Sequence, residues 1–239
     1  MPKTVVITQS NYLPWRGYFD LLQSADEIVL LDSVQYTRRD WRNRNRIKTA
    51  HGLEWLTVSV ETKGQFSQAI DETRISDPAW AAQHIRTIEL AYARAAHFRE
   101  VSPWLFALLR SVADEPFLSQ VNERLLRELC AVLGIRQTIR RCTDVIERDA
   151  LRAMQPTERL VAIASALEAT RYITGPAARD YLDTGQFAAA GIDVVWMAYD
   201  GYPEYSQLWG GFEPHVSIVD LVLNVGAAEA PRFLTRDAG

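Results

Sequence analysis

The chain has 239 residues, enough for one large domain or two small ones with a buried core. Its hydrophobic content of 48% and charged content of 23% are typical of a globular protein. A formal net charge of −4 at pH 7 argues against a protein that coats nucleic acid or anionic membranes by bulk attraction, so anion binding would require a local basic site.

The N-terminal part predicts a βαβ unit. Residues 3–8 (KTVVIT) are rich in β-branched side chains and indicate a buried strand, and the apolar spacing in 15–24 indicates a helix. Residues 26–32 (DEIVLLD) indicate a second strand, which we expect to be parallel to the first. The basic segment 35–48 is interpreted as a loop after that strand, and 54–61 as a third strand.

Residues 78–134 are predicted to be helical. An Asp-Pro pair at 77–78 and a Ser-Pro pair at 102–103 indicate two helix starts, and Gly134 indicates the end of a third helix. Strands and helices then alternate. We expect strands at 136–145, 169–175 and 192–199, the last central in the sheet, and helices at 156–170, 177–191 and 217–226.

These elements predict an α/β fold, a Rossmann-like parallel sheet with a central helical insertion. The predicted organisation is an N-terminal βαβ part with an anion-binding loop (1–77), a helical insertion (78–134) and a C-terminal α/β part that completes the sheet (135–239). Ligands of such sheets bind beyond the carboxyl ends of the strands. Polar and aromatic residues gather in five loops at those ends: 10–17, 32–46, 142–145, 174–178 and 199–207.

The first of these loops predicts a site for a phosphate or carboxylate. Pro14 and Gly17 allow a ligand to approach the backbone, and the following helix N-terminus supplies N–H groups. The spacing is similar to the nucleotidylyltransferase loop, with Trp15 and Tyr18 in place of its Thr/His and His residues. The alternative is a buried aromatic helix that packs against the sheet.

The basic segment has six cationic residues within eleven positions: Arg38, Arg39, Arg42, Arg44, Arg46 and Lys48. Asn43 and Asn45 lie between them, and Trp41 offers a stacking face. Arginine forks suit phosphate, which favours Arg42, Arg44 and Lys48 as ligands of a nucleotide diphosphate, a nucleotide sugar or the acceptor end of a tRNA. The alternative is a solvated loop whose arginines pair with carboxylates.

Several other positions leave two interpretations open. Asp32, at a strand end, is either a general base or a carboxylate that caps a helix or pairs with arginine. Thr174 is either a helix cap or part of a binding site for a carboxylate or phosphate at the helix N-terminus. Asp220 and Asn224, with Ser217, share one helix face that points either to solvent or into a site. Cys142 has no histidine near it in sequence, which disfavours a thiolate nucleophile.

Four segments together resemble the WbqC-like protein family: QSNYLPWRGYFDLL, LLDSVQYTRRDWRNRNRIKT, YITGPAARDYLD and YSQLWGGFEPHVSIVDLVLNVG. The resemblance runs from Gln9 to Gly226. It implies a role in the biosynthesis of bacterial surface polysaccharides or natural products, with transfer of glycine or another aminoacyl group to an amino sugar. The chain departs from the family at Ser10, where proline is usual, and at Cys142 and Thr143, where two serines are common.

The resemblance marks residues in the loops near both ends of the chain. They are Gln9, Asn11, Tyr12, Trp15, Gly17 and Tyr18; Asp32, Gln35, Tyr36, Trp41, Asn43, Arg44, Asn45 and Lys48; Thr174, Gly175 and Tyr181; and Gln207, Phe212, Ser217, Asp220 and Asn224. From this set we predict catalytic roles for Asp32, Asp220, Asn11, Gln9 and Tyr18. We predict that the other residues of the set, together with Arg42, bind substrate or phosphate. Tyr36 and Phe212 are assigned neither role.

Together the residues and the resemblance predict a cytoplasmic transferase or ligase that forms an amide. Its expected substrates are an anionic nucleotide sugar or similar metabolite and an aminoacyl donor, with aminoacyl-tRNA as one form of that donor. The alternatives are a nucleotidylyltransferase-like enzyme that activates a substrate with ATP, or a non-catalytic module that binds a glycan precursor or tRNA. The use of ATP with Mg²⁺ stays open, and neither a tightly bound metal nor a membrane span is expected.

Overall fold

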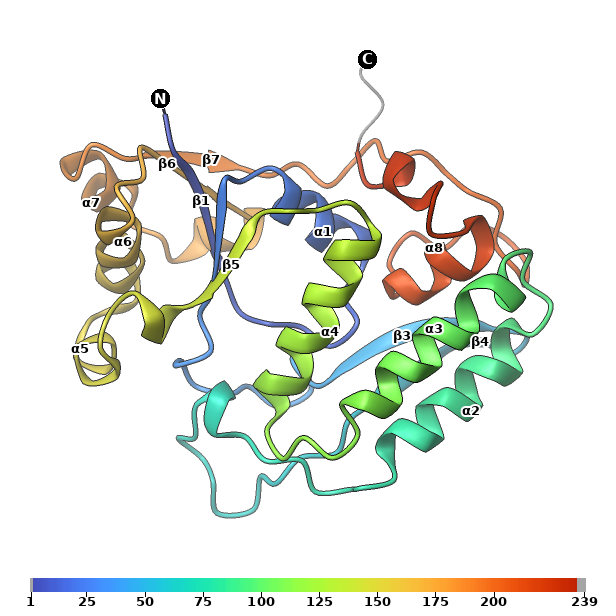
Figure 1. Ribbon diagram of the computed structural model, residues 1–239. Coiled ribbons are helices and arrows are strands. Elements are labelled where there is room, and N and C mark those ends of the chain that lie inside the picture. The colour runs from blue at the N-terminus through green and yellow to red at the C-terminus, as the bar shows by residue number, and fades with distance from the viewer. Residues whose placement is uncertain (1, 236–239) are drawn as a thin grey trace.

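The structure is a computed structural model that describes residues 2–235. Its centre is a five-stranded parallel sheet with the strand order β5-β2-β1-β6-β7 (Figure 1). These strands are β1 (Thr4–Thr8), β2 (Glu27–Leu30), β5 (Thr138–Arg141), β6 (Arg171–Thr174) and β7 (Asp193–Trp196). The predicted Rossmann-like α/β fold is therefore confirmed.

Helices cover both faces of this sheet, as the apolar strands require. Figure 1 shows α6 and α7 on one side of the strands and α1 and α4 on the other. These helices are α1 (Arg16–Gln23), α4 (Leu118–Val132), α6 (Pro156–Ala166) and α7 (Thr184–Ala189); α5 (Arg148–Ala153) precedes α6. Alternate residues of β1 point to opposite faces, so that Val6 packs in one core cluster with Phe19 and Val5 in the other with Phe187.

A second layer of structure extends the first core cluster. The antiparallel ribbon of β3 (Arg44–Thr49) and β4 (Gly52–Thr57) contacts α2 (Trp80–Tyr92) and α8 (Ile218–Val225), and α8 also contacts α3 (Phe98–Ser111). Trp80 of α2, Leu105 of α3 and Leu223 of α8 belong to the same cluster as Val6 of β1. The helical insertion thus shares its core with the central sheet.

Several predicted elements are confirmed. The βαβ opening is present, with Val6 of β1 paired in parallel with Ile28 of β2. The alternation of strands and helices after α4 is also present, and β6 joins β1 while β7 joins β6. Helix α4 ends as expected, because Gly134 follows it with a positive φ of 74°, a conformation that glycine adopts without strain.

Other expectations were wrong in detail. Residues 44–49 form a strand, not a loop, because Asn45 and Ile47 alternate into the core while the arginines point outward. The strand predicted at 54–61 is β4, which pairs only with β3 outside the main sheet, and β7 is an edge strand and not a central one. The amphipathic face of α3 begins at Phe98 and accommodates Pro103, so the Ser-Pro pair does not start that helix.

The helix predicted at 177–191 is also interrupted. A 3₁₀ helix (Pro176–Asp180) is followed by a break, and α7 starts anew at Thr184. Asp183 caps α7, since its side chain accepts a hydrogen bond of 2.9 Å from the N–H of Gly185. The backbone of Asp183 is extended, as is typical of an N-cap residue, so the two helices cannot be continuous.

The central packing of α1 makes a stability prediction. Leu22→Ala removes a side chain that is fully buried between α1 and the sheet, and its loss should lower the free energy of unfolding by about 2–5 kcal/mol. Leu90→Ala, at a position on α2 that is 64% exposed, is the control and should change it by less than about 0.5 kcal/mol. Urea denaturation of both variants measures the difference, and equal effects would contradict the described packing.

Candidate functional site

The path of the chain opens a gap between β1 and β6. The helix after β1 lies on one face of the sheet and the elements after β6 lie on the other, so the two chain segments diverge beyond the strand ends. A cavity of about 570 Å³ occupies this position. Its lining residues are Ile7, Thr8, Gln9, Leu31, Val34, Gln35, Arg42, Pro156, Arg159, Leu160, Tyr172, Thr174 and Tyr181.

A second cavity of about 760 Å³ continues the first one outward. Both are lined by Val34, Gln35 and Arg159, and the second adds polar side chains from residues 61–74 and from Arg152. We refer to the two together as the switch-point cleft. Each of the two cavities has a volume within the range of small-molecule sites.

Arg42 and Arg159 line the inner cavity of the cleft, and Arg74 and Arg152 line the outer one. Arg42 donates a hydrogen bond to Oδ1 of Asn11, and its Nη2 lies 3.6 Å from Oδ2 of Asp40. Arg159 donates to the backbone carbonyls of Leu151, at 2.7 Å, and Met154, at 2.9 Å. Carbonyl groups orient the guanidinium of Arg159 without cancelling its charge, so this cation stays available to an anionic ligand.

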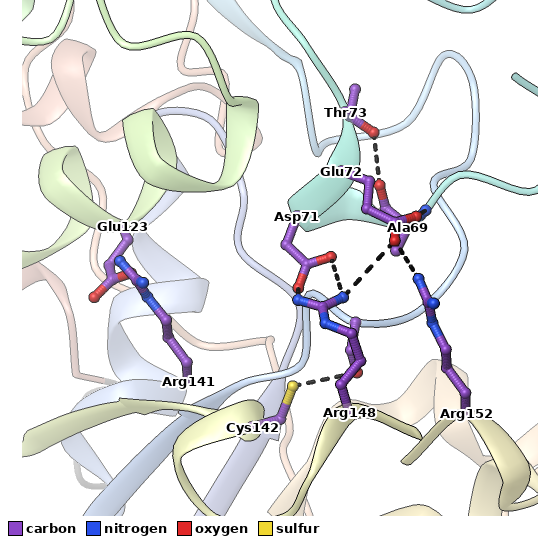
Figure 2. Close-up of polar contacts among 10 residues, drawn as sticks. Ala69, Asp71, Glu72, Thr73, Glu123, Arg141, Cys142, Arg148 and Arg152 are labelled. Atoms are coloured by element: carbon purple, nitrogen blue, oxygen red, sulfur yellow. Dashed lines mark hydrogen bonds and ion pairs between the residues drawn. The ribbon is translucent and has the colours of Figure 1, made fainter. Parts of the chain in front are cut away.

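Ion pairs hold the outer wall of the cleft. Figure 2 shows Arg148 and Arg152 of α5 directed at Asp71 and Glu72 of the 3₁₀ helix Ile70–Glu72. Arg148 binds Asp71 with two hydrogen bonds, of 3.0 and 2.6 Å, and Arg152 binds Glu72. Glu72 also accepts the N–H of Ala69, and this bond leads the causes that lower the pKa of Glu72. The pairs fix α5 to the 3₁₀ helix and neutralise Arg152.

Asp32 lies at the end of β2 beside a smaller cavity of about 140 Å³. Its Oδ1 accepts a hydrogen bond of 2.8 Å from the N–H of Ser10. Burial raises the pKa of Asp32 to about 6, although the bond from Ser10 and the charge of Arg42 both favour the carboxylate. A carboxyl with this pKa exchanges protons near neutral pH, which suits a general acid or base.

Cys142 lines the same small cavity as a neutral thiol. Its Sγ–H donates to Oγ of Ser33 at 3.3 Å, and burial raises its pKa (Figure 2). On the far wall, Arg141 donates to Oε2 of Glu123 at 2.6 Å. A raised pKa and a hydroxyl partner agree with the prediction that Cys142 is no thiolate nucleophile.

A separate cavity of about 400 Å³ has aromatic walls. It is lined by Asn11, Pro14, Trp15, Trp41, Asn45, Arg46 and His215, and we refer to it as the aromatic cleft. The hydrogen bond from Arg42 to Asn11 joins the lining of the switch-point cleft to that of the aromatic cleft. The sequence-predicted residues Asn11, Trp15, Trp41 and Asn45 therefore lie together, but not in the same cavity as Gln9, Gln35, Arg42, Thr174 and Tyr181.

Other predicted site residues belong to a buried polar network under α8. Asp220 accepts hydrogen bonds from the hydroxyls of Tyr92, at 2.7 Å, and Tyr205, at 2.8 Å, and burial raises its pKa. Lys48 donates to Gln207 at 3.0 Å and to the carbonyl of Gly211. Each of these groups has protein partners, as buried polar groups require, and they tie the ribbon to the loop before α8.

Further predicted residues bond to the backbone. Asn224 donates to the carbonyl of Asp220 and Ser217 to that of Leu13, while the Ser217 hydroxyl also caps α8. Asn43 donates to Val58 and Asn45 to Leu13, each at 2.8 Å. Tyr18 donates a hydrogen bond to the Gln9 carbonyl, Arg44 donates to the Arg39 carbonyl, and the Tyr12 hydroxyl is hydrogen-bonded to His84. The two glycines pack closely against aromatic rings, Gly17 against Trp15 and Gly175 against Tyr199.

Sequence reasoning did not find Arg159, which the structure places in the cleft. It lies in the first turns of α6, where one arginine within an amphipathic helix is typical of a solvated surface. Only the position of α6 beside the ends of β1 and β6 shows that this side chain faces the cleft. Within residues 2–235, no group of three or more His, Cys, Asp and Glu side chains is arranged to hold a metal ion.

Fold and cleft together define an α/β protein with a Rossmann-like sheet and a polar cleft at its switch point. The model of the WbqC-like protein family matches residues 9–231, and the chain belongs to this family. It is similar to "Uncharacterized protein Rv1507c" of Mycobacterium tuberculosis (strain ATCC 25618 / H37Rv), with 50% identity over 232 residues and 97% of each chain covered. No solved structure matches the chain significantly. None of the helices in the described residues has the length and apolarity needed to cross a membrane.

The raised pKa of Asp32 predicts a pH-dependent stability. The pKa is about 6 in the folded chain and about 3.9 in the unfolded one, so only the folded chain keeps this proton between those values. The free energy of unfolding should therefore fall by about 2 kcal/mol relative to Asp32→Asn as pH rises from 4 to 6, and become level only above about pH 7. Urea denaturation of both proteins at several pH values measures this, and a constant difference would contradict the raised pKa.

Proposed function

We propose that the chain is an enzyme that transfers an acyl group, such as an aminoacyl group, to an amino group of a nucleotide-linked sugar or similar anionic metabolite. The observation that carries this proposal is the switch-point cleft with Arg42 and Arg159 in its lining. A sheet of this topology binds its ligands at this position. The guanidinium groups suit phosphate oxygens, and the amides and hydroxyls of Gln9, Gln35 and Thr174 suit a sugar.

In the proposed reaction the substrate nitrogen attacks the carbonyl carbon of the acyl donor. A C–N bond forms, the bond from that carbon to the leaving oxygen breaks, and the proton lost by nitrogen passes to the Asp32 carboxylate and then to the leaving oxygen. Its pKa of about 6 supports Asp32 in this role, since the carboxylate predominates at pH 7 yet accepts a proton readily. Gln9 and Arg42 are the proposed donors to the oxyanion, because both line the cleft.

Asp220 and the nucleotidylyltransferase alternative have less support. Both oxygens of Asp220 accept hydrogen bonds from tyrosine hydroxyls, so protein groups already occupy its acceptor positions. The alternative places its reactive groups at Trp15 and Tyr18. Tyr18 is buried with its hydroxyl on the Gln9 carbonyl, and Trp15 faces the aromatic cleft. We therefore assign the chemistry to the region between Arg42 and Asp32.

Removal of either cleft arginine should weaken ligand binding. Arg42→Ala and Arg159→Ala each delete charge-assisted hydrogen bonds, so the dissociation constant for a UDP-linked amino sugar should rise roughly tenfold to a hundredfold. Isothermal titration calorimetry measures this, with Arg99→Ala on the exposed side of α3 as the control that should bind normally. Circular dichroism checks that the variants are folded, and equal affinity in all four proteins would contradict the proposed site.

The role of Asp32 separates an enzyme from a binding module. Asp32→Asn keeps the shape and the acceptor for the Ser10 N–H but removes the proton acceptor, so transfer should fall at least about a hundredfold while substrate binding changes little. Mass spectrometry of UDP-linked amino sugars incubated with a panel of activated amino acids and aminoacyl-tRNA measures transfer. A folded variant that transfers at the normal rate would rule out Asp32 as the base.

A further inference from the structure

Two neighbouring tryptophans are exposed beside the aromatic cleft. Trp41 is 41% exposed and Trp55 is 42% exposed, and their ring centroids are 5.6 Å apart. Indole rings contribute large apolar surfaces, and proteins tend to cover them or to use them at binding sites. These two rings lie together and next to a cavity, an arrangement that suits a ligand able to cover them.

Arginines share the outer face of the β3–β4 ribbon with these rings. Arg46 of β3 lies directly opposite Trp55 of β4 in the antiparallel pairing. The guanidinium carbon of Arg44 lies 4.1 Å from the centre of the Trp55 ring. That of Arg46 lies 5.6 Å from Trp55 and 5.9 Å from Trp41. Because side chains alternate along the strand, Asn45 points into the core while Arg44 and Arg46 point outward. The outer face of the ribbon therefore carries both cationic and aromatic side chains.

The opposite wall of the aromatic cleft is held in place by other aromatic rings. The Trp15 ring contacts His215 at 5.2 Å and Tyr199 at 5.3 Å between centroids. A Cβ at Gly17 would overlap the Trp15 indole, so glycine at this position allows the ring to lie where it does. The indole is therefore positioned before any ligand arrives, which lowers the entropic cost of binding.

From these observations we infer that the aromatic cleft is a second ligand site, which binds a nucleotide by stacking its base on Trp41 and holding its phosphate with Arg46 of its lining and with Arg44, which lies beside it against Trp55. An anion alone would need no indole surface, and an apolar ring alone would need no pair of guanidinium groups. A base joined to a phosphate uses both. Stacking on an aromatic side chain accounts for roughly fivefold to a hundredfold in affinity per base.

The second site would also bind one substrate of the reaction, and this part of the inference rests on the proposed function. Asn11 lines the aromatic cleft and accepts a hydrogen bond from Arg42 of the switch-point cleft. A nucleotide in one cleft and a metabolite in the other would meet at this pair. The bound nucleotide is then the leaving end of the acyl donor, either a free acylated mononucleotide or the acylated end of an RNA strand.

Titrations with AMP, ribose 5-phosphate and a short single-stranded RNA test the second site. Calorimetry should show that AMP binds at least tenfold more tightly than ribose 5-phosphate, and that Trp41→Ala weakens AMP binding by about tenfold. Leu53→Ala is the matched control, because Leu53 is an exposed apolar residue of the same ribbon that does not line the aromatic cleft. RNA binding at least tenfold tighter than AMP identifies the strand end as the source, and equal affinities identify the free nucleotide.

Three results would overturn the inference. They are absence of binding by both AMP and RNA, equal binding of AMP and ribose 5-phosphate, and AMP binding that Trp41→Ala leaves unchanged. Competition between AMP and a UDP-linked amino sugar would likewise show one site, not two. Arg159→Ala should weaken only the sugar ligand. If AMP binds as expected but no acyl donor supports transfer, the proposed function fails while the nucleotide site stands.

Discussion

The reversal of the sheet at β1 is the constraint on which the rest of the structure depends. Strands β2 and β5 are reached over one face of the sheet, and β6 and β7 over the other. The chain segments that leave β1 and β6 must therefore separate, and helices cannot fill the gap between them. The long excursion after β2 returns Arg42 to the edge of this gap, and α6 brings Arg159 to its other side. A polar cleft at this point follows from the topology, and these two side chains place guanidinium groups in its inner cavity.

The concentration of positive charge in an acidic chain has several explanations at once. Lys48 is buried, and its hydrogen bonds to Gln207 and Gly211 tie β3 to the loop before α8. Arg44 and Arg46 lie against indole rings on the outer face of the ribbon. Arg42 lines the switch-point cleft, and its hydrogen bond to Asn11 joins this lining to that of the aromatic cleft. Arg44, Arg46 and Lys48 share one face of β3, and Lys48 differs from the two arginines because it is buried against the loop before α8, while Arg42 precedes the strand.

The sequence was sufficient for the fold class. Apolar runs and helix signals predicted the parallel sheet, because buried parallel strands and amphipathic helices have different periodicities. It was insufficient where one pattern has two physical outcomes. Asp220 and Asn224 on one helix face indicated either a site or a satisfied buried network, and only the contacts with Tyr92 and Tyr205 distinguish them. Arg159 gave no local signal, since its role depends on where α6 packs.

Hydrogen exchange of the intact protein with and without a ligand is the most direct test of the switch-point cleft. Backbone amides report the place of binding without any substitution, so a misfolded variant cannot confuse the result. In the presence of UDP-linked amino sugars, exchange should slow in residues 7–12, 31–42 and 172–182, which contain the strand ends and loops that line the cleft. Protection confined to other parts of the chain, or none with any nucleotide-linked sugar, would contradict the account.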